Sequence, residues 1–216
     1  LRLASCFNNA DGDRYYEAAA AANRVIKEFP KHEKAGDAAY YRYIYLMNQF
    51  RFSRDEGDQK RFQDARKFFT NRYSDHEKAK DLAYFEALEA LERGRRLISG
   101  GKPSEGKTVL LETLDQLKNV DDASALYELA LARRGQVYYE LGAIDSSYDK
   151  QALDTFTDYL DKARNPKGRM EITDPARLEK RQRAMAHADF YTGKVHFRRQ
   201  KWQPTIDVLG TFLVKH

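Results

Sequence analysis

AHADFYTGKVHFRRQKWQPTIDVLGTFLVKH, residues 186–216, is the stretch that decides the fold. Two segments with helical spacing of apolar residues flank a polar turn at residues 199–201, so the stretch predicts a helix–turn–helix unit. Two helices pack closely only where a residue without bulk lies at their crossing. Gly193 in the first helix and Thr205 in the second are the small residues expected at that contact, and Leu209 follows Thr205 by one turn.

The same pattern recurs along the chain. A small residue followed four positions later by an apolar residue occurs in five predicted second helices: Ala18 and Ala22, Ala65 and Phe69, Gly106 and Leu110, Ala152 and Phe156, Thr205 and Leu209. Gly94 and Gly135 are the small residues of two further first helices, in the role of Gly193. No convincing run of alternating apolar and polar residues is present, so the sequence predicts an all-α chain of helix pairs.

An internal repeat supports this organisation. HEKAGDAAY at residues 32–40 recurs as HEKAKDLAY at residues 76–84. Self-similarity of this kind is typical of stacked repeats. The His-Glu pairs also begin like the zinc-protease motif H-E-x-x-H, but Gly36 and Lys80 stand where the second histidine is required. Both pairs are therefore interpreted as residues of the repeat turn, and no metal site is expected.

The small–aromatic and aromatic–small–bulky pattern resembles the tetratricopeptide (TPR) repeat. The resemblance implies an α-solenoid, a right-handed superhelix of antiparallel helix pairs, with residues 1–216 forming one repeat domain of about four to five pairs. The spacings between the five small residues are 47, 41, 46 and 53, longer than the usual TPR period of 34, so longer helices and insertions are expected. The loop at residues 165–173 is one such insertion.

A narrower resemblance rests on the turns at residues 29–40 and 73–84, which follow the signature Phe-Pro, a few polar residues, then Ala-x-x-Ala-Tyr, although the second turn lacks the proline. This is similar to TPR proteins of bacterial cell-envelope assembly, the BamD and CpoB type. It implies a place in the periplasm or at the outer membrane, with the cytoplasm as the alternative. A chain that begins and ends inside expected helices is expected to be a piece of a longer one.

Cys6 is the only cysteine, which excludes a disulfide framework. Residues 3–6, LASC, match the short box before a lipidated cysteine in bacterial lipoproteins. The alternative, favoured here, is that residues 1–9 are the tail of a helix. No transmembrane segment or signal peptide is visible in the sequence.

One motif points to an enzyme instead. GKPSEGKT at residues 101–108 fits the phosphate-binding P-loop, in which Lys107 would reach the phosphates and Thr108 would hold magnesium. A P-loop requires a buried strand before it, whereas residues 88–98 form a charged amphipathic helix pattern. Gly106 is already explained as a packing residue. The chain is therefore expected to be non-catalytic and to use no cofactor, with nucleotide binding at residues 101–108 as the weakest alternative.

Charge is uneven along the chain. Residues 162–201 contain twelve Lys and Arg against four acids, a balance of +8, whereas the whole chain has a net charge of +5. Such a segment can attract an acidic protein, a nucleic acid or an anionic membrane surface. A nucleic-acid-binding helical repeat is therefore the second function to be weighed.

Stacked helix pairs create a concave groove lined by the first helix of each pair. Counting from the small residues predicts eight groove side chains: Leu91, Arg95, Gln136, Tyr139, His187, Phe190, Lys194 and Arg198. Aromatic and arginine side chains dominate binding energy when they are desolvated. The leading prediction is a protein-interaction scaffold that holds a protein or peptide segment, acidic and partly aromatic, in this groove.

Overall fold

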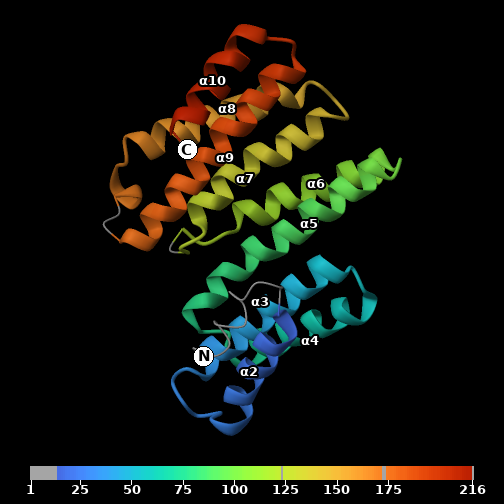
Figure 1. Ribbon diagram of the computed structural model, residues 1–216, viewed down its shortest axis with the longest axis vertical. Helices are drawn as coiled ribbons and strands as arrows, with labels where there is room; N and C mark the ends of the chain where they lie inside the picture. Colours follow the sequence, from blue (N-terminus) through green and yellow to red (C-terminus); the bar gives the residue numbers. More distant parts are fainter. Residues whose placement is uncertain (1–13, 123, 172–173, 216) are drawn as a thin grey trace. The chain divides into compact units, whose positions relative to one another are not determined.

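The computed structural model describes residues 14–122, 124–171 and 174–215, and this part of the chain folds into helices, turns and loops without a strand. The predicted all-α class is therefore confirmed for the described residues. The α-helices in chain order are α2 (Tyr15–Glu28), α3 (Ala35–Ser53), α4 (Glu56–Arg72), α5 (Leu82–Ser99), α6 (Pro103–Lys118), α7 (Tyr127–Gly142), α8 (Tyr148–Arg164), α9 (Pro175–Arg198) and α10 (Trp202–Lys215) (Figure 1). The predictions for residues 1–9 and Cys6 lie outside the described residues.

Two helix starts differ from those predicted. The helix expected from Glu77 begins at Leu82, and the residues before it form the 3-10 helix η1 (Glu77–Asp81). The helix expected from residue 123 begins at Tyr127. In both places tight i to i+3 bonds come first, with Ala79 N–H donating to the His76 carbonyl and Tyr127 N–H to the Ser124 carbonyl. Polar residues that lack an apolar stripe favour this tighter turn.

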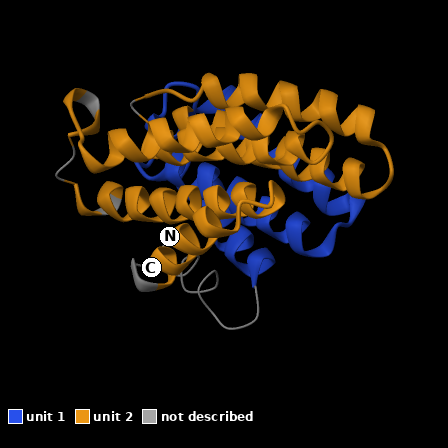
Figure 2. Cartoon of the chain, turned by 90° about the horizontal axis from the view of Figure 1, so that it is seen from above, with its two compact units in different colours: residues 1–79 blue, residues 80–216 orange. Residues whose placement is uncertain are grey.

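The chain divides into two compact units (Figure 2). Unit 1, residues 1–79, contains α2, α3 and α4, with α3 packed against both of the others. Unit 2, residues 80–216, contains α5 to α10, in which each helix packs on its neighbour in the chain and α7 also packs on α9. Each unit is described by itself here, and a single repeat domain over residues 1–216 stays a prediction.

Glycines allow the helix pairs of unit 2 to close. A Cβ atom on Gly94 of α5 would come within 2.7 Å of Leu110 on α6, and the space at Gly193 of α9 is filled by Leu209 of α10. Gly135 of α7 is filled in the same way by the Phe156 ring of α8, which is fully buried. In each pair, the bulky residue that follows the small residue of the second helix by four positions fills the space beside the glycine of the first helix. The sequence predicted only that the two small residues would lie at the crossing.

The repeated turn of the sequence is also a repeated turn of the structure. His32 and His76 each donate a backbone N–H to the carbonyl three residues earlier at 3.1 Å. The Nδ1 atom of each ring accepts the backbone N–H two residues later, at 3.1 Å and 3.2 Å respectively. The two histidines therefore serve as turn residues. The ring of His76 also fills the space beside Gly36, so the two copies of the turn pack against each other within unit 1.

The same kind of contact occurs near the starts of three helices. An acid in or next to the start of a helix is held by a donor from a later turn or helix, in three pairs: Asp37 with His76 at 3.6 Å, Asp81 with Ser124 at 2.6 Å, and Glu128 with Arg181 at 2.8 Å. The last pair is buried, and both Nε and Nη2 of Arg181 donate to the carboxylate. Each pair joins segments that lie about 40 to 50 residues apart in the chain.

Gly193→Ala and Gly210→Ala should change the stability in opposite directions. The first places a methyl group against Leu209 and should lower the free energy of unfolding by roughly 1–3 kcal/mol. Gly210 lies inside α10 with nothing within 4 Å, so its replacement should raise stability by about 0.5–1 kcal/mol through helix propensity alone. Urea unfolding followed by circular dichroism measures both. An equal gain for the two variants would show that no close crossing exists at Gly193.

Candidate functional site

The eight predicted groove residues lie on three helices of unit 2, namely α5, α7 and α9. The structure brings those of α7 and α9 together across the two helices. The Arg198 guanidinium lies 4.2 Å from the centre of the Tyr139 ring, and the Lys194 ammonium lies 4.8 Å from it. We call the surface formed by Arg95, Tyr139, Glu140, Phe190 and Lys194 the α5–α7–α9 face.

Lys194 is the centre of an aromatic cluster. Its ammonium group lies 4.8, 5.0 and 5.6 Å from the ring centres of Tyr139, Tyr191 and Phe190. Phe190 and Lys194 are one turn apart on α9, which places them on the same side of the helix. Each ring attracts the cation through its electron-rich face. Within the described residues Lys194 forms no ion pair, although its charge also acts on the nearby Glu140 carboxylate.

A hollow of about 400 Å³ lies beside this cluster, between α5 and α7, and is lined by Arg95 and Glu140 among others. Arg95 Nε lies 3.3 Å from the Glu140 carboxylate, and its Nη1 donates to Glu92 at 3.2 Å. Burial raises the pKa of Glu140, while the charges of Arg95 and Lys194 oppose that rise. The hollow therefore combines a half-buried acid with cations that can turn to another carboxylate.

Three of the predicted groove residues are mostly enclosed by the protein. Leu91 belongs to the hydrophobic core around α5, α6 and α7. Gln136 is buried, donates to the Tyr191 hydroxyl at 2.8 Å and accepts from Arg133. His187 packs on the Tyr191 ring, and burial together with the nearby charge of Arg133 lowers its pKa to about 3. These side chains support the face from beneath rather than forming its surface.

Arg198 also has a structural partner. It forms an ion pair with Asp149, which is 2% exposed, and donates from Nη1 to the Tyr139 carbonyl at 2.9 Å. The pair occupies the space beside Gly142, where a Cβ atom would overlap both side chains. Arg198 thus joins the end of α7, the start of α8 and the end of α9. Its guanidinium is already engaged before any partner binds.

The basic segment 162–201 is partly neutralised by the fold. Ion pairs engage at least five of its twelve cations: Lys162 with Asp158, Arg164 with Asp189, Arg181 with Glu128, Arg183 with Glu179, and Arg198 with Asp149. Three of these acids lie outside the segment, so the sequence balance of +8 overstates the charge that remains available. This leaves less attraction for a nucleic-acid backbone than the sequence alone indicates.

The P-loop motif lies at a helix–helix turn. α5 rather than a strand precedes it, and Gly106 sits inside α6 against the carbonyl of Gly94. Lys107 lies 3.8 Å from Asp145 and 5.3 Å from the centre of the Tyr148 ring. Thr108 donates its hydroxyl to the Ser104 carbonyl. The motif residues are thus used for packing and helix formation.

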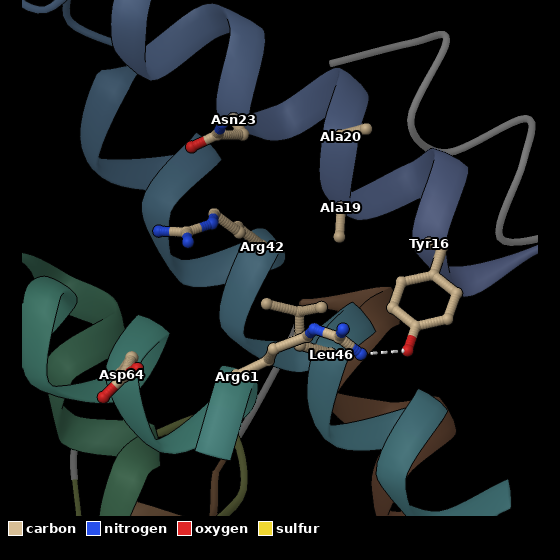
Figure 3. Close-up of a pocket in the computed structure, with 8 residues that line it drawn as sticks. All are labelled: Tyr16, Ala19, Ala20, Asn23, Arg42, Leu46, Arg61 and Asp64. Atoms are coloured by element: carbon tan, nitrogen blue, oxygen red, sulfur yellow. Dashed lines mark hydrogen bonds between the residues drawn. The ribbon is translucent and has the colours of Figure 1, made fainter. Parts of the chain in front are cut away.

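Unit 1 holds a pocket that the sequence did not predict (Figure 3). It has a volume of about 570 Å³ and is lined by all three helices of the unit. The lining residues are Tyr16, Ala19, Ala20 and Asn23 of α2, Arg42 and Leu46 of α3, and Arg61 and Asp64 of α4. Arg42 lies within the aromatic-rich segment of α3, and only the neighbouring α2 and α4 turn its surroundings into a pocket.

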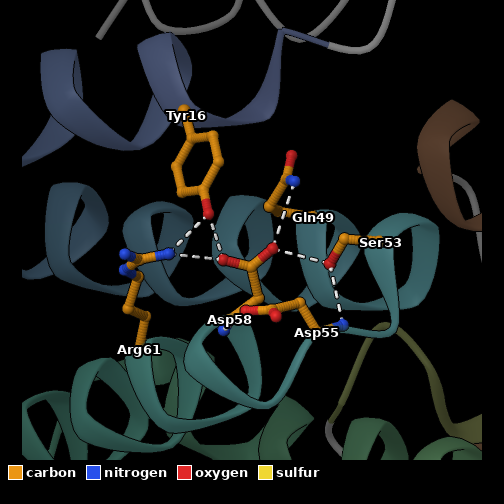
Figure 4. A network of polar contacts seen from close by, with 6 residues as sticks. All are labelled: Tyr16, Gln49, Ser53, Asp55, Asp58 and Arg61. Carbon is orange, nitrogen blue, oxygen red and sulfur yellow. Dashed lines mark hydrogen bonds and ion pairs between the residues drawn. The ribbon is translucent and has the colours of Figure 1, made fainter.

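Beside this pocket, Asp58 ties the three helices of unit 1 together (Figure 4). Its buried carboxylate accepts hydrogen bonds from Ser53 at 2.6 Å, Gln49 at 3.2 Å and the Tyr16 hydroxyl, and Arg61 lies 2.7 Å away. Burial alone would raise the pKa of Asp58, but the hydrogen bonds from these four side chains lower it to about 2. The carboxylate therefore stays ionised in the folded protein.

Comparison of the chain with models of known families, with curated proteins and with solved structures found no match. In the described part of the chain, no group of three or more His, Cys, Asp or Glu side chains could hold a metal ion. None of the helices described there combines the length and the apolar character needed to cross a bilayer.

Arg198→Ala and Lys194→Ala should differ in their effect on stability, because Arg198 holds a buried acid of the fold and Lys194 does not. Removing Arg198 leaves Asp149 buried without its partner and should lower the free energy of unfolding by about 3–5 kcal/mol. Removing Lys194 breaks no ion pair and loses mainly contacts with rings, worth about 0.5–1 kcal/mol. Arg199→Ala, at the exposed neighbour of Arg198, is the control. Thermal unfolding at equal concentration compares the three, and similar values for all would contradict the placement of Arg198.

Asp58 should make unit 1 sensitive to acid. Its pKa is lower in the folded protein than its ordinary value of 3.8, so it contributes stability above that value and loses it as the pH falls toward 2. The loss should be on the order of 2 kcal/mol. Asp58→Asn should be less stable at pH 7 and should show a flatter decline between pH 5 and pH 2. Asp64→Asn, at an exposed acid of the same helix, should keep the wild-type slope.

Proposed function

We propose that the chain is a non-catalytic scaffold that binds an acidic, partly aromatic segment of a partner protein on the α5–α7–α9 face. The observation that carries this proposal is the cluster around Lys194, a cation that contacts three rings and forms no direct ion pair among the described residues. A partner carboxylate would form that ion pair. Phe190, 40% exposed, would supply an apolar anchor beside it.

The hollow between Arg95 and Glu140 supports the same partner chemistry. Arg95 is exposed at its edge and holds two acids of its own chain, Glu92 and Glu140. A carboxylate of the partner can replace Glu92, because ion pairs near the surface contribute little and exchange readily. The face as a whole thus offers two cations, Arg95 and Lys194, alternating with the rings of Tyr139 and Phe190. Such a surface can bind a partner segment in which acidic and aromatic side chains alternate.

We also propose that this scaffold belongs to the TPR class and that its helix pairs continue as a right-handed superhelix. Support comes from the three glycine crossings, the paired histidine turns and the recurrent acid–donor contacts. Repeats of this kind present extended surfaces and need no catalytic group. A role in bacterial envelope assembly, in the periplasm or at the outer membrane, rests on the resemblance of the two turns alone.

Nucleic-acid binding through residues 162–201 is the second function to be tested against this one. It has less support, because the ion pairs of that segment use at least five of its twelve cations. The two functions differ in salt dependence. A protein that neutralises several phosphates loses affinity steeply with salt, whereas two cations on a mixed surface should give a shallow decline.

Site-specific photo-crosslinking tests the proposal. A benzophenone amino acid replaces Phe190 in cells that naturally produce the chain, and the same replacement at Phe52, which is 70% exposed in unit 1, is the control. We expect Phe190 to trap a protein that Phe52 does not. The trapped region should contain acidic and aromatic residues, and its synthetic peptide should bind roughly tenfold more weakly to Lys194→Glu.

Arg199→Glu provides the matched charge reversal, because it lies five residues further along the chain and is exposed in the turn after α9. It should retain the peptide affinity while Lys194→Glu loses it. Equal losses for the two variants would indicate general charge attraction and contradict the assignment. Tight binding of a 20-nucleotide DNA or RNA, with a steep salt slope, would favour the second function instead.

A further inference from the structure

The pocket of unit 1 contains an arginine whose charge is not satisfied. Arg42 is half-buried, and its guanidinium forms no hydrogen bond or ion pair with any described residue. Its closest aromatic contact is the Phe68 ring, 6.0 Å from the guanidinium carbon. Burial lowers the pKa of Arg42, and the charge of Asp64 only partly opposes this. A half-buried guanidinium without an acceptor in the protein keeps its N–H donors available, so the site favours an anion.

The surroundings of Arg42 add donors and an apolar floor. In Figure 3 its side chain lies between Asn23 of α2 and Asp64 of α4, with Arg61 across the pocket. Arg61 uses Nη1 for both Asp58 and the Tyr16 hydroxyl, which leaves its remaining N–H groups uncommitted to these partners. The alanines of α2 and Leu46 of α3 line the apolar part. The pocket therefore offers cationic donors on one side and hydrocarbon on the other.

We propose that this pocket binds a carboxylate that carries an apolar group, such as a free organic acid or the C-terminal residue of a polypeptide. The guanidinium of Arg42 matches a carboxylate with two parallel N–H donors. The apolar group packs on Ala19, Ala20 and Leu46, and a volume of about 570 Å³ is within the range of small-ligand sites. The proposal concerns unit 1 alone and does not depend on the α5–α7–α9 face.

Asp64 decides between a carboxylate and a phosphate. Arg42, Arg61 and Asp64 line the pocket, and Arg61 is already paired with Asp58, so Arg42 is the lining cation that forms no ion pair with a described residue. A single carboxylate can pair with Arg42, whereas a phosphate dianion would be repelled more strongly by Asp64. Asp64 can instead accept an N–H group from the ligand, as an acylated amino acid or a peptide end provides. The charge of the pocket thus favours a monoanion with a neighbouring amide.

Titration of the whole chain with N-acetyl-L-leucine tests this site. The probe has one carboxylate, one amide and a branched apolar side chain, and should saturate on the order of 1–5 mM for a ligand of this size. Nitrogen-15 spectra would follow the arginine Nε–H signals and the amides of α2, α3 and α4. We expect the Arg42 signal to shift with N-acetyl-L-leucine, and N-acetyl-L-leucinamide and inorganic phosphate to leave it unchanged.

Variants locate the response. Arg42→Gln should abolish binding, whereas Arg51→Gln, which removes an exposed arginine from the same helix, should preserve it. Asp64→Asn should tighten binding roughly fivefold by removing the repulsion. The tetrapeptide Ac-Ala-Ala-Ala-Leu separates the two sources: equal or tighter binding identifies a chain end, and binding of N-acetyl-L-leucine alone identifies a free acid. No shift at 20 mM probe, an equal response to the amide, stronger binding of phosphate, or full binding by Arg42→Gln would overturn the proposal.

Discussion

The absence of a side chain at Gly94, Gly135 and Gly193 is the constraint on which unit 2 depends. Each glycine receives a bulky residue of the next helix, so the two backbones approach more closely than a Cβ would allow. This close approach fixes the rotation of each helix about its axis as well as its distance. The rotation in turn directs Tyr191 and Lys194 of α9 toward Tyr139 of α7. The composition of the α5–α7–α9 face is thus a consequence of packing at its back.

Buried ion pairs divide the cations of the chain into two groups. Arg181 and Arg198 are matched by Glu128 and Asp149, acids from other helices that are almost completely buried. Such pairs add little net stability, but they penalise any arrangement that separates them, and so they favour one register of helices. Lys194 and Arg42 form no ion pair among the described residues, although the charges of Glu140 and Asp64 act on them. An external anion can therefore bind either cation without breaking an internal ion pair.

Much of the fold followed from local sequence. Small and bulky residues at helical spacing predicted the pairing of α5 with α6, α7 with α8 and α9 with α10. Each of these crossings joins two helices that are adjacent in the chain, so a short stretch of sequence contains both sides of the contact. The repeated HEK segment predicted its turn for the same reason. The site was less predictable: Lys194 and Arg198 are one turn apart and equivalent by spacing, and only Asp149, 49 residues away, separates their roles. The pocket at Arg42 depends on α2 and α4 together, so no local pattern indicates it.

The two sites treat their positive charges differently, and this has a functional consequence. On the α5–α7–α9 face the rings of Tyr139, Tyr191 and Phe190 stabilise Lys194 in the absence of a partner. The binding free energy that a partner carboxylate contributes there is therefore only the difference between its attraction to Lys194 and that of the rings. In the unit 1 pocket Arg42 is half-buried and forms no ion pair with a described residue, so a carboxylate can pair with it directly. The open face therefore needs several contacts spread along a segment to reach useful affinity. The pocket can select one group, and the physical demands of the two sites point to an extended partner for the first and a single chemical moiety for the second.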